Sequence, residues 1–404
     1  MKTNLLPSTR FLGAAVTRKG YLLNLILFLL PYLAVAQQPY LTGTDFWFIC
    51  RSESNTDGPT LYVSSAYATT VKVELPATGH VTRFSVAAGE TKAFLMTYFY
   101  GGGTSGSIHN EGVHVTSEKP VELLISIPSE EYRKHATQLY PTAILGYEYF
   151  TLNQELRYQY PGASGGSYEI LAVEDNTLVE VTATFSNDLN LPAHQPFTLR
   201  MMAGDRYTMH SGEVDATGSK VRSISDGKHG RKRIAVFANS RNMSPNRTPI
   251  RQVDSYHQQL FPVRLWGQEY VSAPLMNSGV RHTYKVVAAY CNTKVSINNA
   301  APVTIGAGEF IQFDSETACH IVADKPIAVA QYFHRDWDET KGEPETVMLA
   351  PVEQGVTEAT ITSKSLVNIH EHFINVVIPT AQAASFRLDG APIAFSPMPS
   401  NPAL

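Results

Sequence analysis

Apolar and polar residues alternate along most of the chain after residue 60, which is the pattern of strands that cover a core with one face. In "LYVSSAYATTVKVEL", from Leu61, two such strands flank a short polar turn. The pattern recurs in "YEILAVEDNTLVEVTATF" from Tyr168 and "YKVVAAYCNTKVSINN" from Tyr284. The turn is predicted to close on a threonine in each copy: Thr70, Thr177 and Thr293. The chain therefore contains three related strand pairs.

Three further signals recur in the same order. An Ala-Gly-acid turn precedes a strand at Gly89, Gly204 and Gly308. Lys119-Pro120 and Lys325-Pro326 each lie between two strands, whereas the middle copy, "VRSISDGKHGRKRIAVFAN", lacks the Lys-Pro pair. Each copy closes on a Leu-x-Pro sequence, at Pro141, Pro262 and Pro351. Copies of roughly 90–120 residues are longer than solenoid repeats of about 20–50.

We therefore predict an all-β protein with three related β-sandwich-like units in tandem. A β-propeller-like arrangement of short sheets is the alternative, because two four-stranded blades per unit would fit the strand count. The predicted boundaries are a signal peptide at 1–36 and three units at 37–137, 138–258 and 259–348. Residues 349–404 form a C-terminal β segment, which fits part of a truncated further unit.

The first 36 residues have the pattern of a secretory signal. Basic residues precede the apolar run "YLLNLILFLLPYLAVA", which ends on small residues before Gln37. The run is short and contains Pro31, which argues against a membrane anchor. Removing it leaves 28 basic and 36 acidic residues, a net charge of about −8. That sign argues against nucleic acid as the main partner, and no later stretch is apolar enough to span a membrane.

One phrase occurs twice, as "QLYPTAILGYEYF" from Gln138 and "QLFPVRLWGQEYV" from Gln259. Its proline ends one strand, its glycine permits a tight turn, and its last residues begin the next strand. Trp266 and Tyr270 are then either part of a brace between units or residues that face a ligand. The brace is the favoured interpretation, because such aromatic residues are usually core residues.

These segments together resemble the IgG Fc-binding protein N-terminal domain family. The resemblance rests on "QQLFPVRLWGQEYV", "YKVVAAYCNTKVSI", "IGAGE", "ADKPIAVAQYF" and "GEPETVMLAPVEQG" in that order. "FINVVIPTAQAASFRLDG" is most similar to exported bacterial members, and the resemblance runs from Gly43 to Gly390. It implies an extracellular β-rich binding or adhesion module, without identifying any residue that contacts Fc.

Two polar segments are candidate metal sites. His370 and His372 would point to the same side of a strand, but no third ligand is visible. Asp336 and Asp338 lie in "HRDWDETKG", whose acids lack the regular spacing of a calcium loop. The favoured interpretation of both is a solvated strand edge or loop. No cofactor is predicted.

The basic segment "DGKHGRKRI", Asp226 to Ile234, is interpreted as a solvated turn, with contact to an anionic glycan as the alternative. Of the three cysteines, Cys50 is expected to be a buried hydrophobic residue. Cys291 and Cys319 both fall in the third unit, where a disulfide between them and two independent thiols are competing expectations.

The sequence thus predicts a secreted or cell-surface protein that binds an extracellular protein or glycoprotein and is not an enzyme. The rival is a purely structural surface or matrix component. A carbohydrate-active enzyme is a more remote alternative, because no paired catalytic acids or nucleophile elbow stand out.

Overall fold

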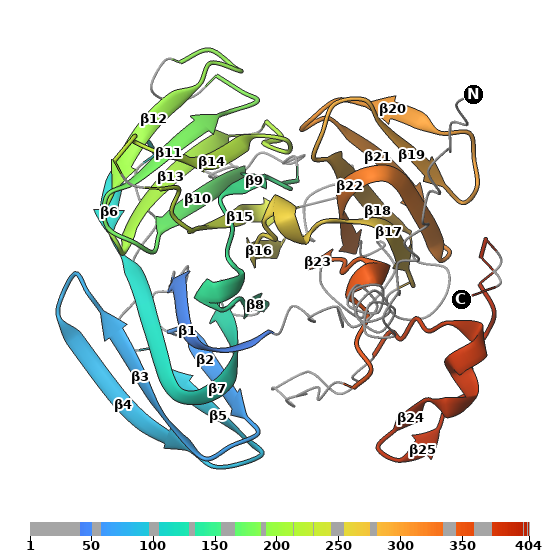
Figure 1. The fold of residues 1–404 in the computed structure, drawn as a ribbon, viewed down its shortest axis with the longest axis horizontal. Coiled ribbons are helices and arrows are strands. Elements are labelled where there is room, and N and C mark those ends of the chain that lie inside the picture. The colour runs from blue at the N-terminus through green and yellow to red at the C-terminus, as the bar shows by residue number, and fades with distance from the viewer. Residues whose placement is uncertain are drawn as a thin grey trace, which may run out of the picture. The chain divides into compact units, whose positions relative to one another are not determined.

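The computed structural model describes most of the chain from residue 41 onward, and its regular structure is nearly all β-strand (Figure 1). The described residues are 41–50, 58–96, 105–128, 134–154, 166–186, 191–212, 214–228, 230–243, 254–274, 281–333, 345–358, 374–398, 400, 401 and 403. The predicted signal peptide lies outside them. No helix within these ranges has the length and apolarity needed to span a membrane. The all-β prediction is confirmed.

The strands fall into three successive sets. The first unit contains β1 (Thr42–Ile49), β2 (Thr60–Ser65), β3 (Thr69–Leu75), β4 (His80–Val86), β5 (Glu90–Leu95), β6 (Ile108–Asn110), β7 (Gly112–Pro128) and β8 (Lys134–Leu139). The second contains β9 (Glu148–Phe150), β10 (Gly166–Ala172), β11 (Thr177–Thr182), β12 (Phe197–Met201), β13 (Asp205–Gly212), β14 (Lys220–Ile224), β15 (Ile234–Met243) and β16 (Asp254–Gln259). The third contains β17 (Gly267–Ser272), β18 (His282–Ala288), β19 (Thr293–Ile297), β20 (Val303–Ile305), β21 (Phe310–Ser315), β22 (Cys319–Phe333) and β23 (Glu345–Met348).

Short 3-10 turns connect the units and follow the third. They are η2 (Thr142–Ile144), η3 (Val263–Leu265) and η4 (Val352–Gln354), and each directly follows the proline of a Leu-x-Pro sequence. Further along, the described residues form η5 (Thr380–Ser385) and a two-stranded sheet of β24 (Arg387–Leu388) and β25 (Ala391–Pro392).

One long strand organises the first unit. The N-terminal half of β7 pairs with β1 and β3, and its C-terminal half pairs with β2 and β8. Because β4 pairs with β3 and β5 pairs with β2, the unit consists of two four-stranded antiparallel sheets that share β7. Side chains from both sheets form a single core cluster. This is a β-sandwich, since the inner faces of two sheets enclose one core.

The other two units repeat this topology. In the third unit β22 takes the place of β7, pairing with β17 and β19 and then with β18 and β23. In the second unit the long strand is divided into β14, which pairs with β9 and β11, and β15, which pairs with β10 and β16. Two sheets that share one strand fit the tandem sandwich-like units, and not separate propeller blades.

The basic segment lies where the long strand of the second unit is divided. Its Lys232 Nζ donates a hydrogen bond to the carbonyl oxygen of Asp175, at the β10–β11 turn. Lys325 of the third unit does the same at the matching turn, bonding the carbonyl oxygens of Cys291 at 2.6 Å and Asn292 at 3.1 Å. The expectation that the second unit lacks the Lys-Pro pair is therefore only half right. The lysine is kept, and Arg233 replaces the proline.

The strand-pair turn also needs one correction. Thr177 and Thr293 each donate from Oγ1 to a carbonyl oxygen three residues earlier, at 2.6 Å. Thr177 pairs with Met201 and Thr293 pairs with Ile305, and both partners lie three residues before the glycine of an Ala-Gly-acid turn. In the first unit the residue at that place is Val86, and it pairs with Thr69. Thr69, and not Thr70, is thus the first-unit counterpart.

Candidate binding surface

Each unit is closed by a contact between its first glycine and its last proline. A Cβ added to Gly146 would lie 2.3 Å from Cβ of Pro262, and one added to Gly267 would lie equally close to Cβ of Pro351. Gly43 and Pro141 make the corresponding contact in the first unit, at 2.5 Å. The repeated phrase therefore contains the proline that closes one unit and the glycine that opens the next.

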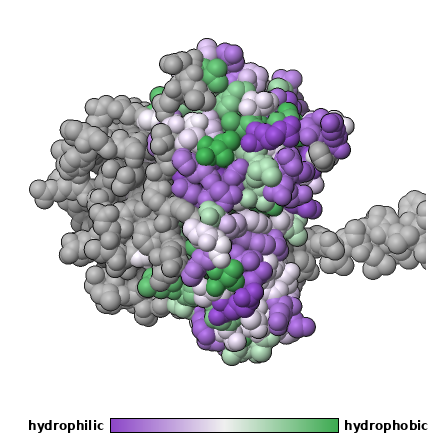
Figure 2. Space-filling view, turned by 90° about the vertical axis from the view of Figure 1, so that its left-hand side faces the viewer, coloured by the Kyte–Doolittle hydropathy of each residue, from purple (hydrophilic) through white to green (hydrophobic). Residues whose placement is uncertain are grey.

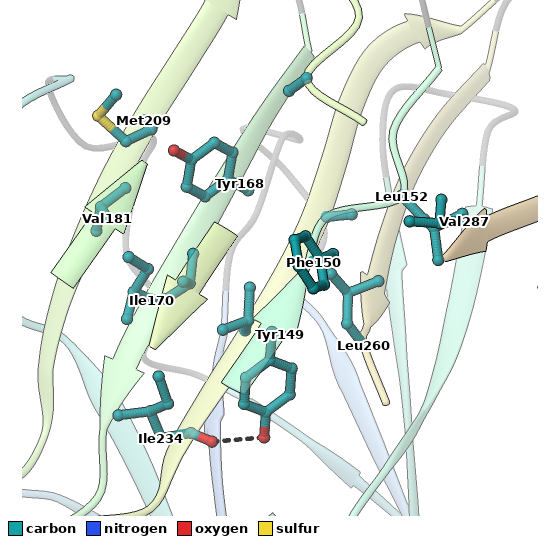
Figure 3. Close-up of a cluster of buried hydrophobic side chains, with 14 of the residues drawn as sticks. Tyr149, Phe150, Leu152, Tyr168, Ile170, Val181, Met209, Ile234, Leu260 and Val287 are labelled. Carbon is teal, nitrogen blue, oxygen red and sulfur yellow. Dashed lines mark hydrogen bonds between the residues drawn. The ribbon is translucent and has the colours of Figure 1, made fainter. Parts of the chain in front are cut away.

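A tyrosine three residues after the glycine reinforces this closure. The Tyr149 hydroxyl donates to the carbonyl oxygen of Ile234 at 2.7 Å and accepts from the Gly146 N–H at 3.0 Å (Figure 3). Tyr270 makes the same bonds to Ile327, at 2.6 Å, and Gly267, at 3.1 Å. Both rings are fully buried.

The structure places both predicted aromatic residues in the interior. Trp266 is 7% exposed, donates from Nε1 to the carbonyl oxygen of Phe261 at 3.1 Å, and lies 5.9 Å from the Phe150 ring of the second unit. Tyr270 is 1% exposed. Their contacts fit a brace between units, and neither side chain is accessible to a ligand.

Successive units meet at joints where two glycines touch. A Cβ on Gly112 of the first unit would lie 2.8 Å from Cα of Gly204 in the second, and Gly112 N–H donates to the Gly204 carbonyl at 2.8 Å. A Cβ on Gly218 of the second unit would lie 2.0 Å from the carbonyl oxygen of Gly308 in the third. Gly204 and Gly308 belong to the Ala-Gly-acid turns and have φ of +87° and +77°, which favours glycine.

Beside each glycine contact, one sheet of the later unit packs on the unit before it. The strands β10 and β18 at the centre of these sheets are buried along their whole length, and not on alternate residues. Phe237 and Leu171 of the second unit belong to the core cluster of the first, and Val287 and Tyr332 of the third unit belong to that of the second (Figure 3 shows Val287). Two faces of each sheet are thus covered.

A buried charge lies at the centre of the first joint. Glu169 of β10 accepts from Arg206 Nη1 at 3.1 Å, and both side chains are fully buried. Arg206 also pairs with Glu111, which precedes Gly112 in the first unit. Asn239 donates to the other Glu169 oxygen at 3.0 Å and is in turn hydrogen-bonded to His257. The network compensates for the cost of burying charge between the units.

The second joint uses the opposite charge at the same position. Lys285 occupies in β18 the register position of Glu169 in β10, since each pairs with the middle of its two neighbouring strands. Its buried ammonium pairs with Asp215 of the second unit and donates to the carbonyl oxygen of Asn153 at 2.5 Å. The Tyr332 hydroxyl donates to the same carbonyl at 3.1 Å. Both joints therefore carry an ion pair that the sequence analysis did not find.

The third position of this series is Tyr62 in β2, which pairs with Ala93 and Leu124. The face of the first unit around it corresponds to the two joint faces, but the described part of the chain does not bury it. We call it the first-unit face. It comprises Thr60, Tyr62, Ser64, Thr91, Ala93, Leu95, Leu124, Ser126, Ala136 and Gln138, all exposed or only partly buried.

The first-unit face has an apolar centre and a hydroxyl-rich border. Tyr62, Ala93 and Leu124 lie side by side at its centre, and Leu95, 57% exposed, lies on the same side at the end of β5. Ser64 and Thr91 bond to each other at 2.8 Å. Glu122 pairs with Ser64 at one end, and partial burial raises the pKa of its carboxyl. An apolar centre within a polar rim is the usual composition of a protein–protein interface.

The opposite sheets carry a repeated acid–base pair on their outer faces. Asp45 and His114 are 2.7 Å apart in the first unit, Glu148 and Lys220 are 2.6 Å apart in the second, and Glu269 and His320 are 2.8 Å apart in the third. Burial raises the pKa of Asp45, but hydrogen bonds to His114 and Thr142 hold it below its usual value. The matching positions of His114 and His320 are thus structural cross-strand pairs.

One outside face of the protein is mixed in character. Figure 2 shows hydrophobic residues there as separate spots among hydrophilic ones.

The basic segment makes structural contacts: Arg231 donates to the carbonyl oxygen of Ser223 at 2.9 Å and to that of Tyr147 at 3.2 Å. These contacts fit the predicted turn.

Cys291 and Cys319 are free thiols in the structure, which fits the second of the two competing expectations. Cys291 lies in the β18–β19 turn beside Lys325, whereas Cys319 begins β22. Six strand residues span about 20 Å, far beyond the roughly 7 Å that a bridge allows between Cα atoms. Cys50 is buried, as expected, and desolvation raises the pKa of its thiol.

The metal candidates His370, His372, Asp336 and Asp338 lie outside the described residues. Among the residues with described structure, no group of three or more His, Cys, Asp or Glu side chains is placed to hold a metal ion.

Comparison with known proteins gives one informative match. No curated protein matches the chain. A solved structure of an anti-sigma factor domain-containing protein aligns with 77% of this chain and 82% of its own at 10% identity, but its TM-score of 0.12 supports no argument about the fold. The family model described as IgGFc binding protein matches residues 135–403, well over half of the chain. The chain belongs to the IgGFc binding protein family.

Proposed function

We propose that this chain is an exported, non-catalytic binding or adhesion module that recognises a protein or glycoprotein outside the cell. Membership of the IgGFc binding protein family supports a binding role. The signal-like first 36 residues support export. The name of the family does not fix the ligand, so IgG Fc is one ligand to test among others.

We assign the contact to the first-unit face, on one observation. The same face is buried against the preceding unit in the second and third units, where Glu169 and Lys285 at its centre are fully buried. In the first unit Tyr62 stands at that centre and, like the rest of the face, is only partly buried or exposed. A surface with an apolar centre that this topology twice uses for packing is suited to a third protein contact.

The rival proposal is a structural surface or matrix component without a specific ligand. The buried joints favour neither the binding module nor the structural component, since both functions are compatible with units that are fixed to one another. The carbohydrate-active enzyme is the more remote alternative. His114 with Asp45 and His320 with Glu269 form the repeated cross-strand pairs, and His257 lies beside Glu169 in the buried network of the first joint.

The test is an array of glycans, secreted glycoproteins and IgG Fc probed with residues 37–404. The proposal predicts saturable binding to one class of protein or glycoprotein. Binding to nothing on the array supports the structural rival. Release of shortened glycans, detected by mass spectrometry, supports the enzyme and contradicts the proposal.

A further inference from the structure

The strand after each Ala-Gly-acid turn is the outermost strand that its own unit contributes to a sheet, and the three strands differ in what pairs with their outer edge. In the second unit, β6 pairs antiparallel with β13, with Ile108 opposite Tyr207 and Asn110 opposite Asp205. Gly106 N–H also donates to the carbonyl oxygen of Thr208 at 3.0 Å. In the third unit β21 pairs only with β18 among the described strands.

The sequence of β21 lacks most of the features that usually protect an edge, and Asp314 is its one charged residue. "FIQFDS" contains no lysine, arginine or proline, and its register with β18 has no bulge. The matching edge strand of the first unit, β5, carries Lys92 where β21 has Ile311. Charged residues, proline and bulges are the common means of preventing an edge strand from pairing with another chain.

The core beside β21 is also incompletely covered. Ile311 and Phe313 pack against the third core cluster but are only partly buried. Their counterparts beside β6, Tyr207 and Met209, are 1% and 0% exposed. An added strand would cover Ile311 and Phe313 in the way that β6 helps to cover the second unit.

The backbone of β21 is oriented for such pairing. The carbonyl oxygen of Glu309 accepts from Ala288 N–H at 3.2 Å, so position 309 faces β18. Because successive residues of a strand alternate, the N–H and C=O groups of Phe310, Gln312 and Asp314 point away from β18. Gln312 and Asp314 are exposed.

We propose that β21 pairs antiparallel with β21 of a second copy of this chain, across a two-fold axis at Gln312. This register places Gln312 opposite Gln312 of the second copy in a hydrogen-bonded pair. It places Ile311 beside Phe313 of the second copy on the core side, which joins two partly exposed apolar side chains. Of the three outward-facing positions, Gln312 is the central one, so an axis there pairs the strand with itself over its greatest length. The pairing is independent of the ligand-binding proposal.

The test is sedimentation analysis of residues 37–404 over about a hundredfold range of concentration, because dimerisation depends on concentration. The wild-type protein is expected to pass from monomer to dimer. Gln312→Pro removes the outward N–H at the centre of the pairing and leaves the bonds to β18 intact, so it is expected to be monomeric. The matched control Ala93→Pro, at the same position of β5, is expected to dimerise like the wild type.

A second variant protects the test against misfolding. Gln312→Lys keeps the N–H but sets two like charges opposite each other, and is expected to weaken dimerisation at least tenfold at low salt. The proposal is overturned by a wild-type protein that stays monomeric throughout. It is equally overturned if both Gln312 variants dimerise normally, or if Ala93→Pro alone abolishes the dimer.

Discussion

Gly218 and Gly308 meet backbone to backbone across the joint between the second and third units. A Cβ on Gly218 would lie 2.0 Å from the Gly308 carbonyl oxygen, a distance that no real Cβ tolerates. Gly112 and Gly204 form the corresponding contact at the preceding joint. The main chains of neighbouring units can therefore touch at these glycines. This close approach lets Arg206 pair with Glu111 at the first joint and Lys285 pair with Asp215 at the second.

Gly308→Ala tests whether this contact contributes to stability. Gly89→Ala is its matched control, because Gly89 lies in the same turn of the first unit with a similar φ of +72° and no atom within 4 Å of an added Cβ. The control is expected to lose about 1–2 kcal/mol from backbone strain alone. Gly308→Ala is expected to lose about 1–3 kcal/mol more, because its Cβ would crowd Gly218 and Phe150. Urea unfolding measures both, and equal losses would contradict the joint contact.

Lys285→Met tests the charge pair at the second joint. It leaves the Asp215 carboxylate without its buried partner, so we expect a loss of about 3–5 kcal/mol in the free energy of unfolding at neutral pH. Adding Asp215→Asn should cost little more, and the double variant should be clearly more stable than the sum of the single losses predicts. Additive losses would show that the two groups do not interact.

Tyr270→Phe removes the hydroxyl that bonds the Ile327 carbonyl and the Gly267 N–H. Both backbone groups are then left without that partner in the interior, and we expect a loss of about 1–3 kcal/mol. Tyr67→Phe, in a side chain that is 58% exposed, serves as the control and should change stability by less than about 0.5 kcal/mol. Guanidinium unfolding of both variants provides the comparison. If Tyr270→Phe leaves the free energy of unfolding unchanged, the Tyr270 hydroxyl does not contribute to the brace.

Glu345 makes stability depend on pH. Burial raises the pKa of its carboxyl to about 7, although it accepts a hydrogen bond from Thr346 N–H at 2.8 Å. The folded state then holds a proton that the unfolded state releases from about pH 4.5, so this group lowers stability as pH rises from about 4.5 to 7. Glu345→Gln should remove that decline and become more stable relative to the wild type by about 1–3 kcal/mol between pH 4 and 8. A constant difference across that range would contradict the raised pKa.

The fold follows largely from repeats visible in the sequence, whereas the joints do not. Alternation in "LYVSS" predicts a sheet with one covered face. β10 and β18 are buried along their whole length although Glu169 and Lys285 interrupt their apolar residues, so their second covered face has no such local signal. The first-unit turn has Ala68 where the others have Asn176 and Asn292 with positive φ, so its sequence does not show that Thr69 is the counterpart of Thr177 and Thr293.

Long-range pairs gave no such signal. Asp215 and Lys285 are brought together only when the second and third units pack, and nothing in their local sequence indicates this. The cysteine pair failed for a related reason. Two cysteines of one unit need not be close together. Cys319 begins β22, whereas Cys291 lies beside Lys325, six residues further along that strand.

The most direct test of the binding proposal is the affinity of variants for the strongest ligand found on the array. Leu95→Arg places a charge on the most exposed apolar residue of the first-unit face, and Val81→Arg does the same at a 40% exposed position of the opposite sheet. The account predicts that Leu95→Arg weakens binding at least tenfold, which corresponds to about 1.4 kcal/mol, while Val81→Arg binds like the wild type. Undiminished binding by a folded Leu95→Arg variant would contradict the assignment of the ligand to this face.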